Sequence, residues 1–297
     1  MDRCESREGR SLSVRDMTRS TLPHRELSVP LYRMRSSVGW IDSHCHGTDP
    51  VWRDSIDSFL HNLAAEGCEA LVMGGIEPEE WEAQRRLPEQ HLRIIRVFGL
   101  HPWTVLNRSD TQLATDWRRL TELLPEADGL GETGLDFHKG PSAHDRQRQR
   151  QWLQKHLQLA IEYQKPLVLH IVRAYPDVWH LLRSFQPEAR GMIHGFWASL
   201  DQARPFLDAG WLLSPNFRLL RTDPHGILKH FPREQIVFES DAPFSTSTGA
   251  VTTPLLARQA MEHAATLWLE TPEEVMNRQR RNLASLFPRL QSDRLSS

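Results

Sequence analysis

The 297-residue sequence has few cysteines, no long apolar run and little net charge. Three cysteines without a Cys-x-x-Cys pair exclude a disulfide framework. The longest uninterrupted apolar stretch, residues 70–76, is far shorter than the roughly 18 residues of a membrane helix. The formal net charge of −2 excludes a protein that holds nucleic acid mainly by bulk positive charge. With 39% hydrophobic and 25% charged residues, we expect a globular protein of the reduced cytoplasm, without a membrane partner.

Residues 1–38 differ from the rest of the sequence. They hold eight Arg, no Lys and five acidic residues, and no helical or strand period persists in them. A secretory signal needs an apolar core of about 7–15 residues, and a mitochondrial transit peptide is poor in acids, so neither fits. We expect a disordered N-terminal extension, or an upstream start codon in place of Met34, and a folded domain over residues 39–297.

Eight short, mostly apolar segments have the character of buried β-strands. They are residues 38–44, 70–76, 94–100, 129–135, 166–172, 191–196, 211–214 and 236–239. Helix-like segments lie between them, and two further helices, 254–269 and 272–287, follow. Alternating strands and helices over about 250 residues predict an α/β fold, a closed (β/α)₈ TIM barrel. An open doubly wound sheet is the alternative, but His-Cys-His stands where its Gly-rich loop would follow the first strand.

Side chains that bind metals recur at the carboxyl ends of five predicted strands. They are His44, His46, Glu132, His170, His194 and Asp241. In a barrel these strand ends form one mouth. Residues i and i+2 of a strand point to the same side, so His44 and His46 can face one ion. The set exceeds the needs of one tetrahedral ion, so we expect two divalent ions (Mg²⁺, Mn²⁺ or Zn²⁺) with a bridging carboxylate such as Glu132.

Each of these side chains also has an ordinary structural explanation. A single strand-end histidine is usually a hydrogen-bonded core residue, Glu132 alone would suit a buried ion pair, and Asp241 would suit a helix N-cap. The combination favours the metal centre, because chance does not readily place six ligand-type residues at five strand ends. Cys45 alternates with the candidate ligands along its strand, so we expect it to pack behind the site.

Several motifs follow one another in a distinctive order. They are Ile41-Asp-Ser-His-Cys-His46, Gly99-Leu-His-Pro102, Gly131-Glu-Thr-Gly-Leu-Asp136, Pro166-Leu-Val-Leu-His170, Ile193-His-Gly-Phe196, Glu239-Ser-Asp-Ala-Pro243 and Asn282-Leu-Ala-Ser-Leu-Phe287. In this order they resemble the TatD family of metal-dependent hydrolases, over about residues 40–287. The resemblance implies an amidohydrolase-like TIM barrel with extra C-terminal helices, and the DNase activity of characterised members.

The resemblance also implies roles for individual residues. His44, His46 and Asp241 would hold one ion, His170 and His194 the second, with Glu132 between the two. Asp241 would accept the proton of the attacking water, which makes Asp241 and Glu132 the catalytic residues. His101 would contact the substrate phosphate. The implied reaction is two-metal hydrolysis of a phosphodiester in DNA, as single strands or 3′ ends, by a 3′–5′ exonuclease.

The substrate-binding rim departs from the family pattern. Val172 and Thr48 occupy positions where the family usually has Arg and Asp, Trp197-Ala-Ser replaces Ser-Gly-Ser, and no Asn-x-Pro is recognisable in residues 244–254. Arg173 is the nearest replacement for the missing Arg. Further candidates are the cations Arg108, Lys139, Arg218 and Arg221 and the stacking faces Trp52, Trp103, Phe137, Trp197 and Phe244. Each of these also suits a solvated loop charge or a packing aromatic.

Three functions remain open on the sequence. The first is a metal-dependent DNase. The second, motivated by the altered rim, is a metal-dependent hydrolase of a non-nucleic-acid ester or amide, or of an aminoacyl-tRNA ester. The third is a non-catalytic scaffold in a larger complex, against which the complete ligand set argues. A monomer is favoured in each case.

Overall fold

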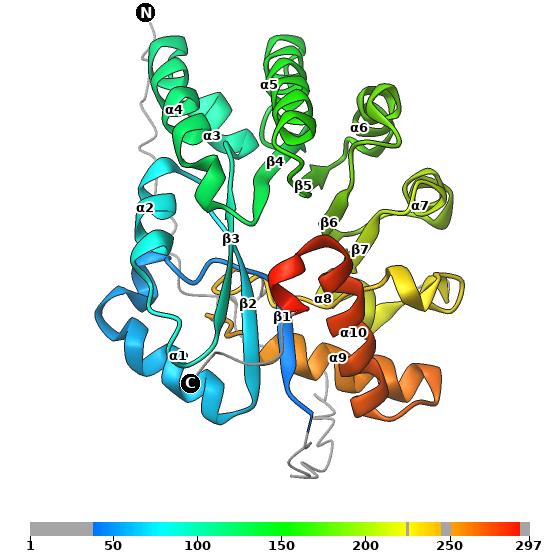
Figure 1. Cartoon of the computed structure of the whole chain (residues 1–297). Helices are drawn as coiled ribbons and strands as arrows, with labels where there is room; N and C mark the ends of the chain where they lie inside the picture. The colour runs from blue at the N-terminus through cyan, green and yellow to red at the C-terminus, as the bar shows by residue number, and fades with distance from the viewer. Residues whose placement is uncertain (1–37, 224–225, 245–250, 292–297) are drawn as a thin grey trace, which may run out of the picture. The chain divides into compact units, whose positions relative to one another are not determined.

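Seven parallel strands stand side by side in chain order (Figure 1). They are β1 (Trp40–Cys45), β2 (Cys68–Gly74), β3 (Arg93–Phe98), β4 (Gly129–Asp136), β5 (Leu167–Val172), β6 (Gly191–Phe196) and β7 (Leu212–Pro215). The computed structural model describes residues 38–223, 226–244 and 251–291. Apart from Val38, the N-terminal extension expected over residues 1–38 therefore lies outside the described residues.

The eighth predicted strand exists as isolated backbone pairings rather than as a regular strand. Val237 N donates to Leu213 O on β7 (3.0 Å), and Ser43 N on β1 donates to Phe238 O (3.1 Å). The segment thus lies between β7 and β1 and nearly closes the sheet into a barrel. Because β7 has only four residues, it offers the segment few backbone partners. The predicted TIM-barrel fold is confirmed, with this reduction of its last strand.

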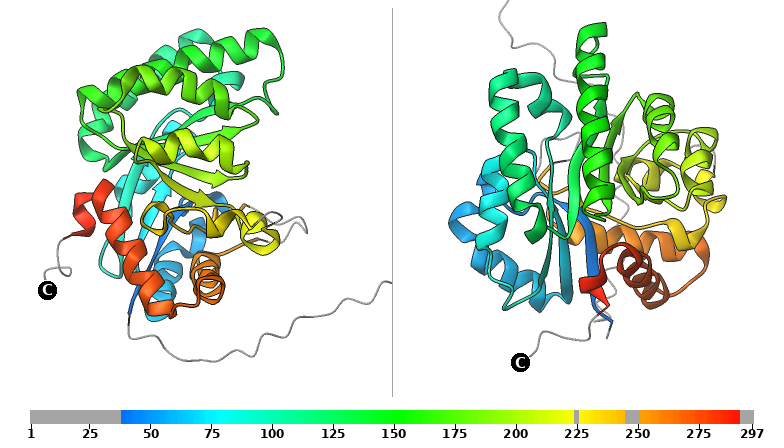
Figure 2. Two further views of the ribbon diagram at one scale, coloured as in Figure 1. Left: turned by 90° about the vertical axis from the view of Figure 1, so that its right-hand side faces the viewer. Right: turned by 45° about the horizontal axis from the view of Figure 1, so that its top comes forward.

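Helices alternate with the strands and lie around them (Figure 2). They are α1 (Ile56–Ala65), α2 (Pro78–Arg86), α3 (Pro102–Asn107), α4 (Asp110–Leu123), α5 (Ala143–Glu162), α6 (Tyr175–Leu182), α7 (Leu200–Asp208), α8 (Phe217–Thr222), α9 (Leu255–Trp268) and α10 (Pro272–Leu286). Short 3₁₀ turns are η1 (Pro50–Ser55), η2 (Leu124–Glu126), η3 (Arg183–Phe185), η4 (Ile227–Lys229), η5 (Arg233–Gln235) and η6 (Pro288–Leu290). No helix among the described residues is long and apolar enough to cross a membrane.

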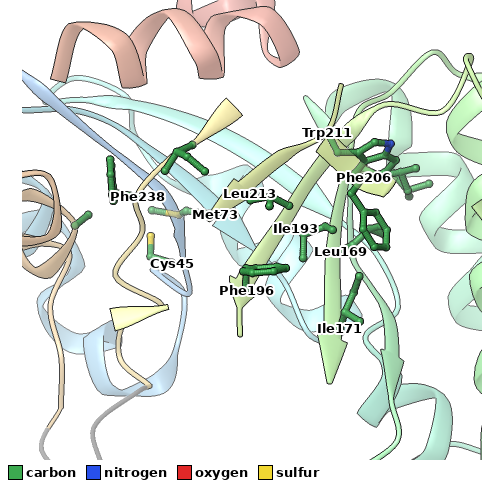
Figure 3. Packing of buried hydrophobic residues seen from close by; sticks show 14 of the residues in the cluster. Cys45, Met73, Leu169, Ile171, Ile193, Phe196, Phe206, Trp211, Leu213 and Phe238 are labelled. Carbon is green, nitrogen blue, oxygen red and sulfur yellow. The ribbon is translucent and has the colours of Figure 1, made fainter. Parts of the chain in front are cut away.

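The buried apolar side chains form two clusters, one on each face of the strands. Leu169 and Ile171 of β5 belong to the larger cluster, which includes the side chains that pack against the helices (Figure 3). Val168 directly precedes Leu169, faces the opposite side of the strand and belongs to the smaller cluster inside the barrel. By the same alternation His170 follows Val168 on the inner side. Cys45 lies in the larger cluster and is 1% exposed, so it packs behind the site as predicted.

Helix α10 closes the amino-terminal end of the barrel. Its Gln279 side chain accepts from Phe238 N (2.7 Å) and donates to Phe238 O (2.8 Å) and to Ile41 O. Leu283 and Phe287 extend the inner apolar cluster and are both 0% exposed. The two predicted closing helices are therefore present, and α10 blocks the end opposite the strand carboxyl ends. The other end is left as the mouth, where parallel barrels carry their sites.

Candidate metal centre

Strand β4 places a carboxylate at the centre of the barrel mouth. Glu132 is 1% exposed, and ring nitrogens of five histidines lie within 3.5 Å of its oxygens. From Oε2 the distances are 3.2 Å to His44 and 3.3 Å to His46, and from Oε1 they are 3.5 Å to His101, 3.3 Å to His170 and 2.6 Å to His194. The two oxygens thus face two groups of imidazoles, one from β1 and one from the strand ends across the barrel.

Asp241 lies beside the β1 histidines, after the segment that replaces the eighth strand. Its Oδ1 is 3.4 Å from His46 Nε2 and 3.9 Å from His44 Nε2, and its side chain is 31% exposed. The residue has a φ of 51°, in the left-handed region that Asp and Asn adopt more readily than other non-glycine residues. Asp241 therefore joins the buried cluster to solvent at the mouth.

Two glycines allow the strands that carry these side chains to pack closely. A Cβ at Gly74, where β2 ends, would lie 2.5 Å from His44 Cε1 and 3.3 Å from Glu132 Oε2. Gly134 has a φ of 148°, and a Cβ there would lie 1.9 Å from the carbonyl oxygen of His170. Side chains at these positions would push the ligand-bearing strands apart.

The cluster fits divalent metal ions. Ring nitrogens and carboxylate oxygens from three combinations of its residues lie within 4.8 Å of one another: His44, His46 and Glu132; His44, His194 and Asp241; and His101, Glu132 and His170. Several of these buried atoms have no hydrogen-bond partner among the described residues: both nitrogens of His44, Nδ1 of His46 and His194, Nε2 of His170 and Oε2 of Glu132. Unsatisfied buried polar atoms are costly. Nitrogen and carboxylate donors suit Zn²⁺ and similar ions, which would satisfy them.

The carboxylate and the imidazoles shift one another's protonation. Burial alone would raise the pKa of Glu132, but its electrostatic interactions with the neighbouring imidazoles, that of His194 above all, outweigh burial and hold that pKa well below its usual range. Burial opposes charge on His194, yet Glu132 and Glu239 raise the pKa of His194 well above its usual value. Glu132 is therefore an anion, and as such it can attract metal cations into the mouth.

His101 lies deeper than its expected place near the substrate. It is 2% exposed and caps α3, with Nδ1 accepting from Trp103 N (3.1 Å) and Nε2 3.5 Å from Glu132 Oε1. Burial, with the charge of His170, lowers the pKa of His101 to about 4. A neutral ring whose Nδ1 accepts carries its proton on Nε2. The phosphate contact assigned to His101 remains a prediction, and the structure makes this residue a neutral N–H donor at the centre.

His156 of α5 supports the strand end that precedes His101. It is fully buried, its Nε2 accepts from Leu100 N (3.1 Å), and its Nδ1 donates to Trp152 O (2.7 Å). Burial lowers the pKa of His156 to about 4, so the folded protein holds the ring neutral.

We expect this ring to make stability depend on pH. Between the unfolded pKa of about 6.5 and the folded value, the unfolded chain binds the proton and the folded one does not. The contribution of His156 is complete above pH 6.5 and falls by about 3 kcal/mol as the pH drops to about 4. Urea unfolding of wild type and His156→Gln across this range measures the difference. Parallel pH dependences in the two proteins would contradict it.

Two further carboxylates lie behind the cluster and were not assigned from the sequence. Glu239 Oε1 accepts from Gly195 N (2.7 Å) and lies 3.6 Å from His194 Nδ1. Asp136 Oδ2 lies 3.5 Å from His170 Nε2. Both residues stand inside the quoted motifs at strand ends, which was the available signal. Their spacing alone does not reveal which histidine each would face.

Exposed aromatic side chains lie around the mouth. Trp103, Trp197 and Phe244 are 36%, 40% and 41% exposed, and each follows the end of a strand or of the segment that replaces the eighth. Phe244 lies edge-on to His46, with ring centroids 5.0 Å apart. Two other candidates are engaged elsewhere: Phe137 is only 5% exposed, and Trp52 stacks on a residue of α1. Three of the candidate aromatic side chains are thus exposed at the mouth.

The candidate cations differ in their availability. Arg108 is tied to Glu77, Glu79 and Asp116 at 2.9, 3.2 and 2.9 Å, so it is not free to receive a phosphate. Arg173 is exposed and has no hydrogen bond or ion pair with the described residues. Lys139 lies over the Trp103 ring, 5.4 Å from its centroid. Arg221 is also exposed, whereas the side chain of Arg218 lies outside the described part.

An acidic pocket of about 530 Å³ adjoins the mouth beside Phe244. Its lining includes Asp49, Glu77, Glu79 and Glu80, together with Arg108, which is paired with Glu77 and Glu79. Burial raises the pKa of Glu80 to about 7, although the charge of His46 partly offsets this effect. Four carboxylates and one cation therefore line the pocket on the β1–β2 side of the mouth.

A barrel with this cluster of histidines and carboxylates at its carboxyl-end mouth is a metal-dependent hydrolase of the amidohydrolase-like group. The chain belongs to the family of TatD-related DNases, whose pattern it matches over residues 41–288. The family resemblance of the sequence motifs is thereby confirmed.

Individual relatives carry related names. The chain is 28% identical to the uncharacterized metal-dependent hydrolase YjjV of Escherichia coli, over 77% of this chain and 88% of that protein. The crystal structure of YjjV superposes with a TM-score of 0.73 at 24% identity, covering 84% of this chain and 98% of that one. The chain is 27% identical to the deoxyribonuclease Tat-D of Schizosaccharomyces pombe (70% and 73% covered). It is 28% identical to the 3′-5′ ssDNA/RNA exonuclease TatD of Pantoea vagans (73% and 86% covered).

Proposed function

We propose that this hydrolase is a DNase that removes nucleotides from the 3′ end of single-stranded DNA with two divalent ions. The observation that carries the proposal is Glu132, buried among five imidazoles beneath a mouth with three exposed aromatic faces. Relatives named as a deoxyribonuclease and as a 3′-5′ exonuclease support the choice of DNA. The exposed Trp103, Trp197 and Phe244 suit unpaired bases, each stacked base contributing about 1–3 kcal/mol.

The residues divide into three proposed roles. His44, His46 and Asp241 would hold one ion and His170 and His194 the other, with Glu132 between them. Bound ions supply Lewis-acid neutralisation of the phosphoryl oxygens and lower the pKa of water. His101 would donate from Nε2 to a phosphate oxygen, and Arg173, which lacks a partner among the described residues, would contact the strand.

Asp241 is the proposed proton acceptor. Burial would raise its pKa, but the hydrogen bond from His46 and the charges of His194, His46 and His44 lower it overall. The carboxylate is therefore ionised at neutral pH and able to accept a proton at Oδ1 or Oδ2. Its partial exposure gives water direct access to it, whereas Glu132 is closed off from solvent.

A second candidate function is hydrolysis of an uncharged or cationic ester or amide. The acidic pocket beside Phe244 favours it, because carboxylates there repel a continuing phosphate backbone. The engagement of Arg108 by three carboxylates points the same way. This candidate retains the metal centre and changes only what the mouth binds.

A time course on a 5′-labelled single-stranded oligonucleotide tests the choice. Mg²⁺, Mn²⁺ and Zn²⁺ are supplied in turn, with a chelator control and Asp241→Asn in parallel. We expect a ladder of products shortened from the 3′ end, dependent on the metal and absent in the variant. Folded protein that binds metal but cleaves no oligonucleotide would overturn the DNase proposal, and a panel of esters and amides would then test the second candidate.

A further inference from the structure

Asp136 stands at the carboxyl end of β4 with both side-chain oxygens occupied. Its Oδ1 accepts from the backbone N atoms of His138 and Lys139, each at 2.9 Å. Its Oδ2 accepts from Trp103 Nε1 at 2.7 Å and lies 3.5 Å from His170 Nε2. The residue is 2% exposed. One oxygen thus secures the loop after β4, and the other connects a rim tryptophan with a histidine of the metal centre.

The position of Asp136 determines which nitrogen of His170 is free for a metal. A carboxylate only accepts, so His170 Nε2 next to it carries the ring proton. Nδ1 then has its lone pair facing the centre, where it lies 3.1 Å from His194 Nε2, from which it can accept, and 3.3 Å from Glu132 Oε1. His194 has the opposite arrangement, because its Nδ1 faces Glu239 (3.6 Å) and its Nε2 faces Glu132 (2.6 Å). A carboxylate behind each ring therefore selects the nitrogen turned inward.

The β1 histidines lack this support. Each ion pair that His44 and His46 form with a described carboxylate is made by Nε2, toward Glu132 or Asp241, so no such carboxylate is paired with their Nδ1 atoms. A carboxylate behind the ring is thus found at His170 and His194 but not at His44 and His46.

Trp103 links the buried Asp136 carboxylate to the exposed rim of the mouth. Its ring is 36% exposed, its N–H is held by Asp136, and the Lys139 ammonium lies 5.4 Å from its centroid. The Trp103 and His170 rings lie nearly perpendicular, with centroids 6.2 Å apart. A displacement of Asp136 Oδ2 would therefore change the positions of both the Trp103 ring and the His170 ring.

We propose that Asp136 is a positioning residue that holds His170 as an Nδ1 metal ligand and, through the same oxygen, fixes Trp103 at the rim. Metal binding at His170 and the placement of Trp103 are thereby coupled. The inference rests on the metal centre of the proposed function but does not depend on DNA as the substrate.

Zn²⁺ binding to the full-length protein tests the role of Asp136 in metal binding. In Asp136→Asn, the retained oxygen can still accept from the backbone of His138 and Lys139, while an amide N–H₂ replaces Oδ2. That group donates toward His170 Nε2 and favours the tautomer with a protonated Nδ1, which cannot bind metal. By competition with a chromophoric chelator, we expect about 10–100-fold weaker Zn²⁺ binding. Wild-type affinity in folded Asp136→Asn would overturn the positioning role.

Tryptophan emission tests the coupling and does not require Asp136→Asn to fold. We expect Zn²⁺ to change the emission of the wild type, and the change to vanish in Trp103→Phe but persist in Trp197→Phe, which removes the other exposed rim tryptophan. Folded Asp136→Asn should lack the change even at saturating Zn²⁺. An undiminished change in Trp103→Phe would overturn the coupling. Wild-type protein that binds no Zn²⁺, Mn²⁺ or Mg²⁺ would instead remove the metal centre, and the proposed function with it.

Discussion

Glu132→Gln is expected to produce the largest loss of metal binding of any single substitution in the chain. The carboxylate is the one group that faces all five histidines of the cluster among the described residues, and it is almost fully buried. Loss of a residue that only orients a ligand already weakens metal binding by about 10–100-fold. Loss of the central carboxylate should exceed this, so we expect the metal dissociation constant to rise by at least about 100-fold. Hydrolysis should fall at least as far, because the proposed two-ion centre has this carboxylate between its ions.

Two measurements separate this loss from misfolding. At a Zn²⁺ concentration 100 times the dissociation constant, the metal should stabilise the wild type by about 2.7 kcal/mol. The stabilisation should disappear in Glu132→Gln while its unfolding remains cooperative. Glu122→Gln, an exposed carboxylate near the end of α4, is the matched control and should behave as wild type. Retained hydrolysis and a retained Zn²⁺ effect in Glu132→Gln would contradict the role given to this residue.

The architecture could be predicted from local sequence patterns because its strands are buried on both faces. Such strands are continuous apolar runs, and the predicted 191–196 coincides with β6. The exception is residues 236–239, which are apolar enough for a strand. Whether such a segment forms a regular ladder depends on the register of both neighbours, and β7 and β1 are far apart in sequence. Composition carries no information on that register.

The centre of the site could be predicted for a different reason. Side chains alternate along a strand, and all strands of a barrel end at the same mouth. Strand-end residues therefore come together regardless of loop conformation, as Glu132, His170 and His194 do. Contacts between loops follow no such rule. Arg108 was a candidate phosphate contact, yet carboxylates of the α2 region and α4 neutralise it. The double use of Asp136 Oδ2 likewise depends on how α3 sits against β4, which no spacing in the sequence encodes.

Asp241→Asn should affect the chemical step more than the metal centre. The substitution preserves shape, and Asn adopts the left-handed backbone at this position at least as readily as Asp, so we expect normal folding. The amide cannot take a proton from water, and loss of a general base lowers kcat by about 10²–10⁴-fold. Metal binding should weaken far less than in Glu132→Gln, because the buried anion among the histidines is untouched.

The contrast between the two variants distinguishes a proton acceptor from a metal ligand. Single-turnover rates at saturating metal report the chemical step, and metal content after dialysis reports the ions. Asp208→Asn, an exposed carboxylate at the end of α7, controls for loss of a charge. If Asp241→Asn loses its ions as completely as Glu132→Gln, and excess metal restores its rate, then Asp241 acts as a ligand alone. In that case another group at the mouth must accept the proton, and Glu132 is too buried to meet water from solvent.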